Sequence, residues 1–293
     1  MMFKELKNGV KIPMIGFGVY QIPAEDTKRC VLDAISVGYR HIDTAQTYFN
    51  EEGVGEAIKE CGLNREELFI TTKVWLQHYG YEKTKASVEE SLRKLKTDYI
   101  DLMLLHQDYN DVYGAYRALI DLYKEGKLRS IGVSNFYSDR LVDIASFTEI
   151  PPMVNQMEIN PLHQRKELQE WANKYNCALE AWAPFVQGKN GIFENETLKA
   201  IGDKCNKTVA QVIVRWLLQR DIIVLAKSTH KERMAENINV FDFALTEEDM
   251  KKISDMDEQR SSFHVHTDPN TVEWFVKAVE DRKWYWDKDK EKK

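Results

Sequence analysis

Short apolar segments alternate with amphipathic segments along most of this chain, and this alternation limits the fold more than any other feature. We expect eight strands, at residues 14–20, 40–45, 68–74, 100–106, 130–136, 153–159, 178–184 and 222–228. Between them, apolar residues recur at helical spacing, as in 24–38, 81–97, 112–127, 168–176 and 208–220. Repeated strand–helix units predict parallel pairing with right-handed crossovers. Eight units in 293 residues predict an α/β fold of the closed (β/α)₈ TIM barrel type.

The first residues carry a hairpin signal instead. Two short strand-like runs flank Asn8-Gly9, a pair favoured in type I′ turns. We expect residues 1–13 to form a hairpin that covers the bottom of the barrel. No linker-like composition divides the chain, so we expect a single domain over 1–293, with a C-terminal loop and charged tail over about 256–293.

Composition narrows the classes of function. Lys and Arg number 41 and Asp and Glu 47, a net charge of −6 that argues against a nucleic-acid partner. The N-terminus has no signal-peptide pattern, and no apolar run approaches the ~18 residues of a membrane span. The four cysteines show no zinc-like spacing, and His264 and His266 alone seldom make a metal site. We therefore expect a cytoplasmic protein without a metal.

Polar residues gather at the predicted strand ends, where barrels of this kind carry their chemistry. The second strand gives Asp43, with Tyr48 shortly after it, the third gives Lys73 and the fourth His106. A tyrosine has a reference pKa near ~10, and a neighbouring ammonium lowers it. We expect Lys73 to do this, Asp43 to orient the lysine, and His106 to bind the same substrate oxygen. The Tyr48 phenol would then donate a proton to a substrate oxygen on which negative charge develops.

The chemistry that fits such a proton donor is hydride addition to a carbonyl, since no metal or nucleophile is evident. Hydride must come from a nicotinamide, because side chains cannot supply one. Asn135 and Gln156 would hold its carboxamide, and Trp182 would stack on its ring. Lys227 and Arg233, beside the start of a helix, suit the 2′-phosphate of NADP.

Six segments resemble the motifs of the bacterial-type aldo-keto reductases in order and spacing. They are RHIDTAQTYFNEEGVGEAI, TTKVW, LLH, GVSNF, NQMEINP and AKSTHKERMAEN, within about 16–255. The resemblance implies an NADPH-dependent reductase of aldehydes or ketones in which Tyr48 donates the proton. We assign the cofactor contacts to Gly18, Val19, Ser134, Asn135, Gln156, Trp182, Lys227, Ser228, Thr229, Arg233, Glu236 and Asn237. The substrate wall is assigned to Tyr20, Trp75 and His106.

The match departs from the family pattern at a few positions. Ala226 stands where Pro is frequent, Gln107 follows His106 where Trp is common, and His230 replaces a small polar residue. The changed pocket wall leaves the substrate open among small aldehydes, α-dicarbonyls and keto-sugars. Two other functions stay open: a Schiff-base lyase with Lys73 as nucleophile, and a non-catalytic NADP-binding sensor. The family is often monomeric, which favours a monomer.

Overall fold

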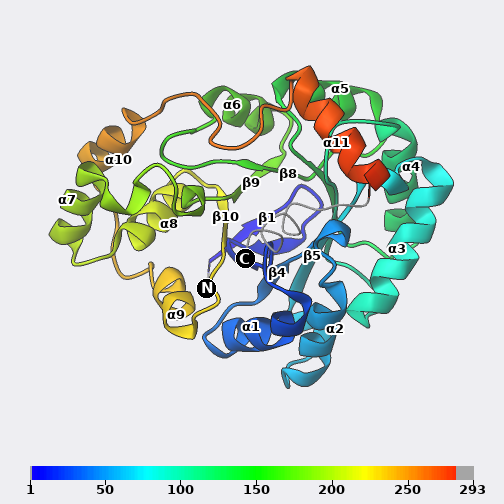
Figure 1. Ribbon diagram of the computed structural model, residues 1–293, viewed down its shortest axis with the longest axis horizontal. Helices are drawn as coiled ribbons and strands as arrows, with labels where there is room; N and C mark the ends of the chain where they lie inside the picture. The colour runs from blue at the N-terminus through cyan, green and yellow to red at the C-terminus, as the bar shows by residue number, and fades with distance from the viewer. Residues whose placement is uncertain (1, 282–293) are drawn as a thin grey trace.

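The computed structural model describes residues 2–281, and within that range eight parallel strands close into a barrel (Figure 1). Each strand lies inside the range expected from the sequence. They are β3 (Ile15–Gly18), β4 (His41–Asp43), β5 (Phe69–Val74), β6 (Leu102–Leu105), β7 (Ile131–Ser134), β8 (Val154–Glu158), β9 (Ala178–Trp182) and β10 (Ile223–Ala226). The strands follow one another around the barrel in chain order, and β10 pairs with β3 to close it. The predicted (β/α)₈ barrel is confirmed.

Helices surround the barrel and connect its strands (Figure 1). They are α1 (Ala24–Ser36), α2 (Glu51–Glu60), α3 (Tyr81–Leu95), α4 (Val112–Lys124), α5 (Ser138–Phe147), α6 (Lys166–Lys174), α7 (Glu196–Cys205), α8 (Val209–Gln219), α9 (Lys231–Ile238), α10 (Glu247–Ser254) and α11 (Pro269–Asp281). The start of α8 shows how the sequence sets such a boundary. Thr208 caps it and closes a capping box with Gln211, which satisfies the first N–H groups of the helix.

An antiparallel hairpin, β1 (Phe3–Glu5) and β2 (Lys11–Pro13), covers the amino ends of the barrel strands. Lys7 Nζ donates a hydrogen bond to the carbonyl oxygen of Pro152, at 2.7 Å, just before β8. Asn8 Nδ2 donates to the carbonyl oxygen of Arg129, at 2.9 Å, just before β7. These bonds confirm the predicted cap at the bottom of the barrel.

The turn of this hairpin differs from the expected type I′. That turn needs a positive φ at both central residues, but only Gly9 of the pair has one, at 83°. The amide of Gly9 donates to the carbonyl oxygen of Leu6, and the amide of Leu6 donates to that of Val10. The loop therefore holds three residues and ends with the glycine in the left-handed region.

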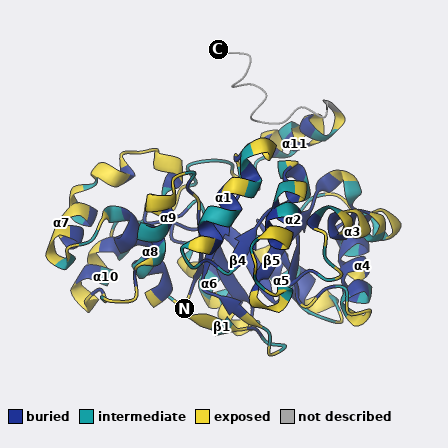
Figure 2. Cartoon of the chain, turned by 90° about the horizontal axis from the view of Figure 1, so that it is seen from below, coloured by how far each residue is buried: buried dark blue, intermediate teal, exposed yellow. Residues whose placement is uncertain are grey.

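Helix α11 lies at the other end of the barrel from β1 (Figure 2). Its Phe275 packs on Trp75, which directly follows β5, with ring centroids 5.8 Å apart. The C-terminal segment thus borders the carboxyl ends of the strands, where the sequence predicts the site. Met1 and the predicted tail at 287–293 lie outside the described residues. The extent of a single domain over 1–293 stays a prediction.

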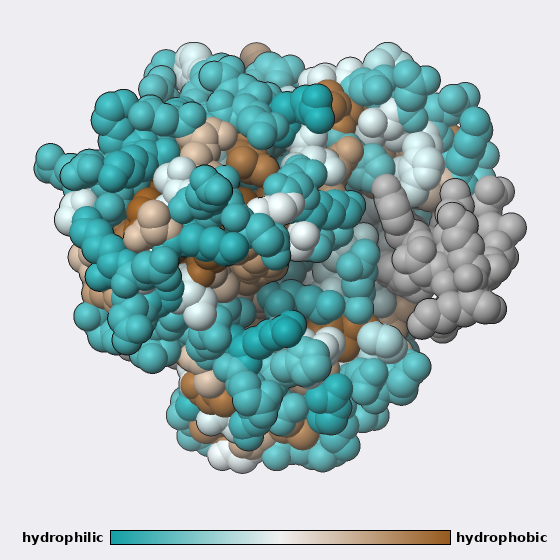
Figure 3. Space-filling model, turned by 60° about the vertical axis from the view of Figure 1, so that its left-hand side comes forward, coloured by the Kyte–Doolittle hydropathy of each residue, from teal (hydrophilic) through white to brown (hydrophobic). Residues whose placement is uncertain are grey.

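The outer face over α7, α8 and α10 is mostly hydrophilic, with apolar side chains in small separate groups (Figure 3). No helix within residues 2–281 combines the length and apolar character needed to cross a bilayer. The apolar side chains instead fill the barrel and the layer between strands and helices, where Figure 2 shows the strands as buried.

Candidate active site

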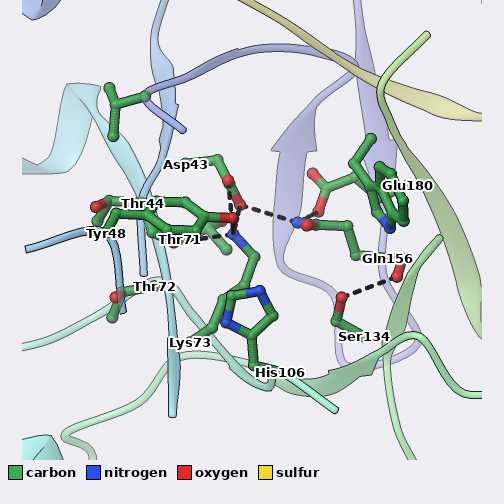
Figure 4. A network of polar contacts seen from close by, with 12 residues as sticks. Asp43, Thr44, Tyr48, Thr71, Thr72, Lys73, His106, Ser134, Gln156 and Glu180 are labelled. Atoms are coloured by element: carbon green, nitrogen blue, oxygen red, sulfur yellow. Dashed lines mark hydrogen bonds and ion pairs between the residues drawn. The ribbon is translucent and has the colours of Figure 1, made fainter. Parts of the chain in front are cut away.

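The four side chains predicted as catalytic meet at the carboxyl end of the barrel (Figure 4). Asp43 ends β4, Lys73 lies in β5, Tyr48 ends the short helix η1 (Gln46–Tyr48), and His106 follows β6. Lys73 Nζ lies 2.6 Å and 2.8 Å from the carboxylate oxygens of Asp43, and 2.9 Å from the carbonyl oxygen of Thr44. Tyr48 Oη lies 3.5 Å from the same Nζ, and the Tyr48 and His106 ring centroids are 5.7 Å apart. The structure therefore brings an ammonium, a phenol and an imidazole together.

The loop that carries Tyr48 is held by Asn50, a residue that the sequence analysis missed. Asn50 Nδ2 donates to the carbonyl oxygens of Val19 and Ile22, at 3.0 Å and 3.2 Å. Thr44 Oγ1 donates to Asn50 Oδ1 at 2.8 Å. Asn50 precedes α2 but makes no capping bond to that helix. Its side-chain oxygen and nitrogen instead bond to Thr44, Val19 and Ile22. In the sequence, an asparagine just before a helix indicates an N-cap and gives no sign that it holds the preceding loop.

The pKa of Tyr48 is shifted in the direction opposite to the expected one. Burial raises the pKa of Tyr48 well above its ordinary value, and the charges of Asp43 and Glu180 raise it further. Lys73 makes its short contacts to Asp43 and the Thr44 backbone, with the phenol at a longer distance. In this structure, burial outweighs the lowering of the Tyr48 pKa that the sequence analysis expects from Lys73. The phenol keeps its proton at neutral pH, as a proton donor must.

His106 is a neutral imidazole in this site. Burial lowers its pKa well below the ordinary value, and the nearby Lys73 and His266 lower it further. Its Nδ1 is buried without a hydrogen-bond partner among residues 2–281. A neutral imidazole carries one N–H donor, which suits it to bind an oxygen and not to take part as an acid. This agrees with the orienting role expected from the sequence.

Ser134, Asn135 and Trp182 form a hydrogen-bonded group at the carboxyl ends of β7 and β9. Asn135 has a left-handed backbone with φ of 64°. Its amide nitrogen donates to the carbonyl oxygen of His106 at 3.0 Å and to Ser134 Oγ at 3.2 Å. Trp182 Nε1 donates to Asn135 Oδ1 at 3.0 Å. The group fixes the Asn135 side chain and ties it to the loop of His106.

Gln156 points its side-chain amide toward Asp43 and Glu180 (Figure 4). Its amide nitrogen donates to Asp43 Oδ2 at 2.9 Å and to Glu180 Oε2 at 2.7 Å. Both N–H groups are therefore used, and the amide oxygen is the atom left for a carboxamide. Glu180 was missed by the sequence analysis, although a glutamate in the middle of the apolar strand 178–184 was a usable signal.

The residues predicted to bind the nucleotide phosphate lie in the loop between β10 and α9 and at the start of α9. Lys227 and Arg233 are exposed, and neither has an anionic partner within the described part of the chain. Ser228 Oγ accepts from the amide of His230 at 3.1 Å, and Thr229 is half-buried beside it. Two unpaired cations next to a helix start fit an anionic phosphate.

The other predicted cofactor residues flank this place. Gly18 ends the neighbouring strand β3 and Val19 follows it, and the amide of Val19 donates to the carbonyl oxygen of Asp43 at 3.0 Å. Glu236 and Asn237 lie in α9, where Thr208 Oγ1 donates to the Glu236 carboxylate at 2.8 Å and Asn237 is buried. The residues that the sequence predicts to contact the cofactor therefore lie along the barrel mouth from β7 to α9.

Aromatic side chains wall the space above the four polar groups. The ring of Tyr20 lies 5.0 Å from that of Tyr48, and the ring of Trp75 lies 5.0 Å from that of His106. Phe275 of α11 packs on Trp75, so the C-terminal segment adds to this wall. His264 and His266 are part of the same aromatic packing, and no group of potential metal ligands is found within residues 2–281.

The model of the Aldo/keto reductase family matches residues 14–258, which covers the strands and residues described above. This chain belongs to the aldo-keto reductase family. The predicted family and the predicted enzyme class, an oxidoreductase, are thereby confirmed.

This aldo-keto reductase is 48% identical over 251 residues to glyoxal reductase from Bacillus subtilis (strain 168), a match that covers 85% of this chain and 90% of that protein. It is 39% identical over 257 residues to methylglyoxal reductase DkgA of Escherichia coli (strain K12), covering 87% of this chain and 93% of that protein. A solved structure of a Bombyx mori aldo-keto reductase in complex with NADP has a TM-score of 0.86 and 33% identity, covering 93% of this chain and 96% of that chain.

Proposed function

We propose that this chain reduces aldehyde or ketone carbonyls to alcohols with NADPH, and that small α-dicarbonyl compounds are its preferred substrates. The observation that carries the reaction is the buried phenol of Tyr48 beside the Lys73–Asp43 pair and a neutral His106. The two reductases named for glyoxal and methylglyoxal support the substrate class. The rings of Tyr20 and Trp75 lie beside Tyr48 and His106 and would give the substrate site an apolar wall.

The cofactor would be held at two places in the chain. Lys227 and Arg233 would bind the 2′-phosphate, since both cations lack an anionic partner in the described residues. Asn135 and the free amide oxygen of Gln156 would bind the carboxamide, and the ring of Trp182 would support the nicotinamide. NADPH, when bound, supplies the hydride.

The polar groups of the site handle the substrate oxygen. The N–H of His106 orients the carbonyl, and Tyr48 gives its proton to the oxygen as charge develops there. Lys73, 3.5 Å from the phenol, stabilises the phenolate left behind, and Asp43 keeps the ammonium charged and in place. Lys73 and Asp43 are buried, and the lower local dielectric strengthens their electrostatic contacts.

The same geometry disfavours the lyase alternative. An amine nucleophile must be neutral, but Lys73 Nζ lies 2.6 Å from the Asp43 carboxylate and is fully buried. An ammonium in a tight ion pair does not add to carbonyls. The geometry does not argue against the sensor alternative. Measuring whether the protein turns over a carbonyl substrate decides between the sensor and the reductase.

The test compares wild type with Tyr48→Phe by following NADPH absorbance with methylglyoxal. We expect kcat/KM to fall by about 10²–10⁴, the usual loss when a positioned general acid is removed. NADPH affinity, measured by fluorescence titration, should stay within about threefold, because the phenol is not one of its contacts. Tyr116→Phe is the matched control, since Tyr116 is a buried phenol on α4 outside the site. Wild type that binds NADPH but reduces no carbonyl would favour the sensor.

A further inference from the structure

A second buried carboxyl group lies below the four polar groups of the site. Glu180 projects from β9 into the barrel and is fully buried. It is linked to Asp43 through one amide nitrogen, because Gln156 Nε2 donates to Asp43 Oδ2 at 2.9 Å and to Glu180 Oε2 at 2.7 Å (Figure 4). Strand register explains the arrangement, since Gln156 and Glu180 are direct partners of β8 and β9.

The two carboxyl groups share a single cation. Lys73 of β5 makes both of its short carboxylate contacts to Asp43, and none to Glu180. The other titratable group facing Glu180 is His41 of β4, whose Nε2 lies 3.6 Å from Glu180 Oε1. On the β10 side, Glu180 pairs with Ile223 in the strand register, which brings no charge. Two buried carboxylates and one ammonium leave one negative charge without compensation, which is costly in a barrel interior.

His41 does not supply the missing positive charge. Burial lowers its pKa to about 3, so the ring is neutral over the working range of most enzymes. Its Nε2 already lies 2.9 Å from Thr71 Oγ1, and its ring fits because the adjacent Gly16 has no Cβ. Burial, and then the charge of Asp43, raise the pKa of Glu180 to about 8. Burial also raises the pKa of Asp43, but Lys73 opposes this shift, whereas Glu180 has no contact with the ammonium. We therefore assign the proton of the pair to Glu180.

We propose that Glu180 is a positioning residue of this reductase, which as a neutral acid holds Gln156 against Asp43 and, when it ionises, suppresses proton donation by Tyr48. The inference rests on the proposed function for its catalytic part. An ionised Glu180 would compete with Asp43 and the phenolate for the charge of Lys73. Its negative charge would also raise the pKa of the Tyr48 phenol. Reduction should therefore slow as Glu180 loses its proton.

The first test measures the proton itself, by infrared spectroscopy of the full chain without substrate. A protonated carboxyl group has a C=O stretching band separate from those of carboxylates and amides. We expect such a band at neutral pH that disappears as pH rises through about 8. It should be absent in Glu180→Gln, which keeps the size of the side chain and an oxygen to accept from Gln156. Glu51→Gln is the control, since Glu51 is another buried glutamate, bonded to Thr72 at 2.7 Å outside the site.

The second test measures the pH profile of kcat/KM for reduction. For one proton, we expect wild-type kcat/KM to be about tenfold below its plateau one pH unit above the Glu180 pKa, and Glu180→Gln to lose less than about twofold there. Glu51→Gln should behave as wild type. If Glu180→Gln fails to fold, ¹³C-carboxyl labelling of glutamate in the double variant Glu51→Gln with Glu158→Gln removes the other two buried glutamates of the described residues, so that a remaining band belongs to Glu180. Three results would overturn the inference: a band that survives in Glu180→Gln and still disappears as pH rises through about 8, a labelled double variant without a band, or equal pH profiles of kcat/KM for wild type and Glu180→Gln. Because the band needs no turnover, a protein that shows it but reduces nothing refutes only the proposed function.

Discussion

Replacing Lys73 by methionine should destabilise this protein by several kcal/mol, because it leaves a buried carboxylate unpaired. Lys73 Nζ lies 2.6 Å and 2.8 Å from the Asp43 oxygens, and both side chains are buried. At an effective dielectric constant of about 20, charges about 2.7 Å apart attract by about 6 kcal/mol. After Lys73→Met, the Asp43 carboxylate keeps one donor, the amide of Gln156. Methionine preserves the apolar stem, so the loss reports the charge.

The variant can limit this loss by protonating Asp43. Protonating a carboxyl group of ordinary pKa near ~4 costs about 4 kcal/mol at pH 7 and about 1.5 kcal/mol at pH 5. We therefore expect Lys73→Met to lose about 4 kcal/mol of unfolding free energy at pH 7, within the range for broken buried pairs, and clearly less at pH 5. Lys73→Met with Asp43→Asn should recover most of it, since no charge is then buried.

Urea unfolding followed by circular dichroism at both pH values measures these losses. Lys85→Met is the control, because Lys85 Nζ lies 2.9 Å from Glu125 on the surface, where such pairs contribute at most about 1 kcal/mol. A loss below about 1 kcal/mol at pH 7 would refute the reasoning. So would equal losses at the two pH values, or a double variant no more stable than Lys73→Met.

Three other predictions concern the cofactor, the barrel packing and pH. Lys227→Ala and Arg233→Ala should each weaken NADPH binding about tenfold or more in fluorescence titrations and leave NADH, which lacks the 2′-phosphate, nearly unaffected; equal losses for both nucleotides would remove these residues from the phosphate site. Gly16→Ala should lose about 1–3 kcal/mol in urea unfolding, because its Cβ would lie 2.6 Å from a neighbouring side-chain carbon. Gly18→Ala, with its nearest atom at 4.0 Å, should stay within about 0.5 kcal/mol of wild type, and similar losses at both positions would contradict this. Protonated Glu180 contributes its full stability below the unfolded-state pKa of ~4.5. This contribution is lost as pH rises to about 8, at up to about 1.4 kcal/mol per pH unit. Urea midpoints should therefore fall faster with pH in wild type than in Glu180→Gln.

Much of the fold follows from sequence because each strand–helix unit carries its own signal. All eight barrel strands lie inside the ranges expected from apolar runs, and α8 begins at the predicted cap, Thr208. The strand ends differ from the expected ones by at most two residues, because a local pattern does not show where the hydrogen bonds of the ladder stop. The predicted turn type at Asn8-Gly9 was wrong, because the length of the loop depends on how the two strands pair. The identity of two residues does not determine that pairing.

Site residues could be predicted where their position along a strand determines at which end of the barrel their side chains lie. Asp43, Lys73 and His106 follow from strand ends, since parallel strands of a barrel bring their carboxyl ends together. What could not be predicted depends on contacts across the barrel. Gln156 turns its amide toward Asp43 and Glu180, and the pKa of Tyr48 rises because burial outweighs an ammonium 3.5 Å away. Neither burial nor the facing residue is encoded in a local pattern.

Hydride transfer from NADPH to a carbonyl carbon is the central claim, and isotope transfer tests it most directly. Purified protein would be given methylglyoxal and NADPH that carries deuterium at the transferable position of C4 of the nicotinamide, and the product analysed by mass spectrometry. We expect an alcohol with one deuterium on the carbon that bore the carbonyl oxygen. An unlabelled alcohol, or no alcohol from methylglyoxal, glyoxal or a simple aldehyde while NADPH binds, would contradict the claim.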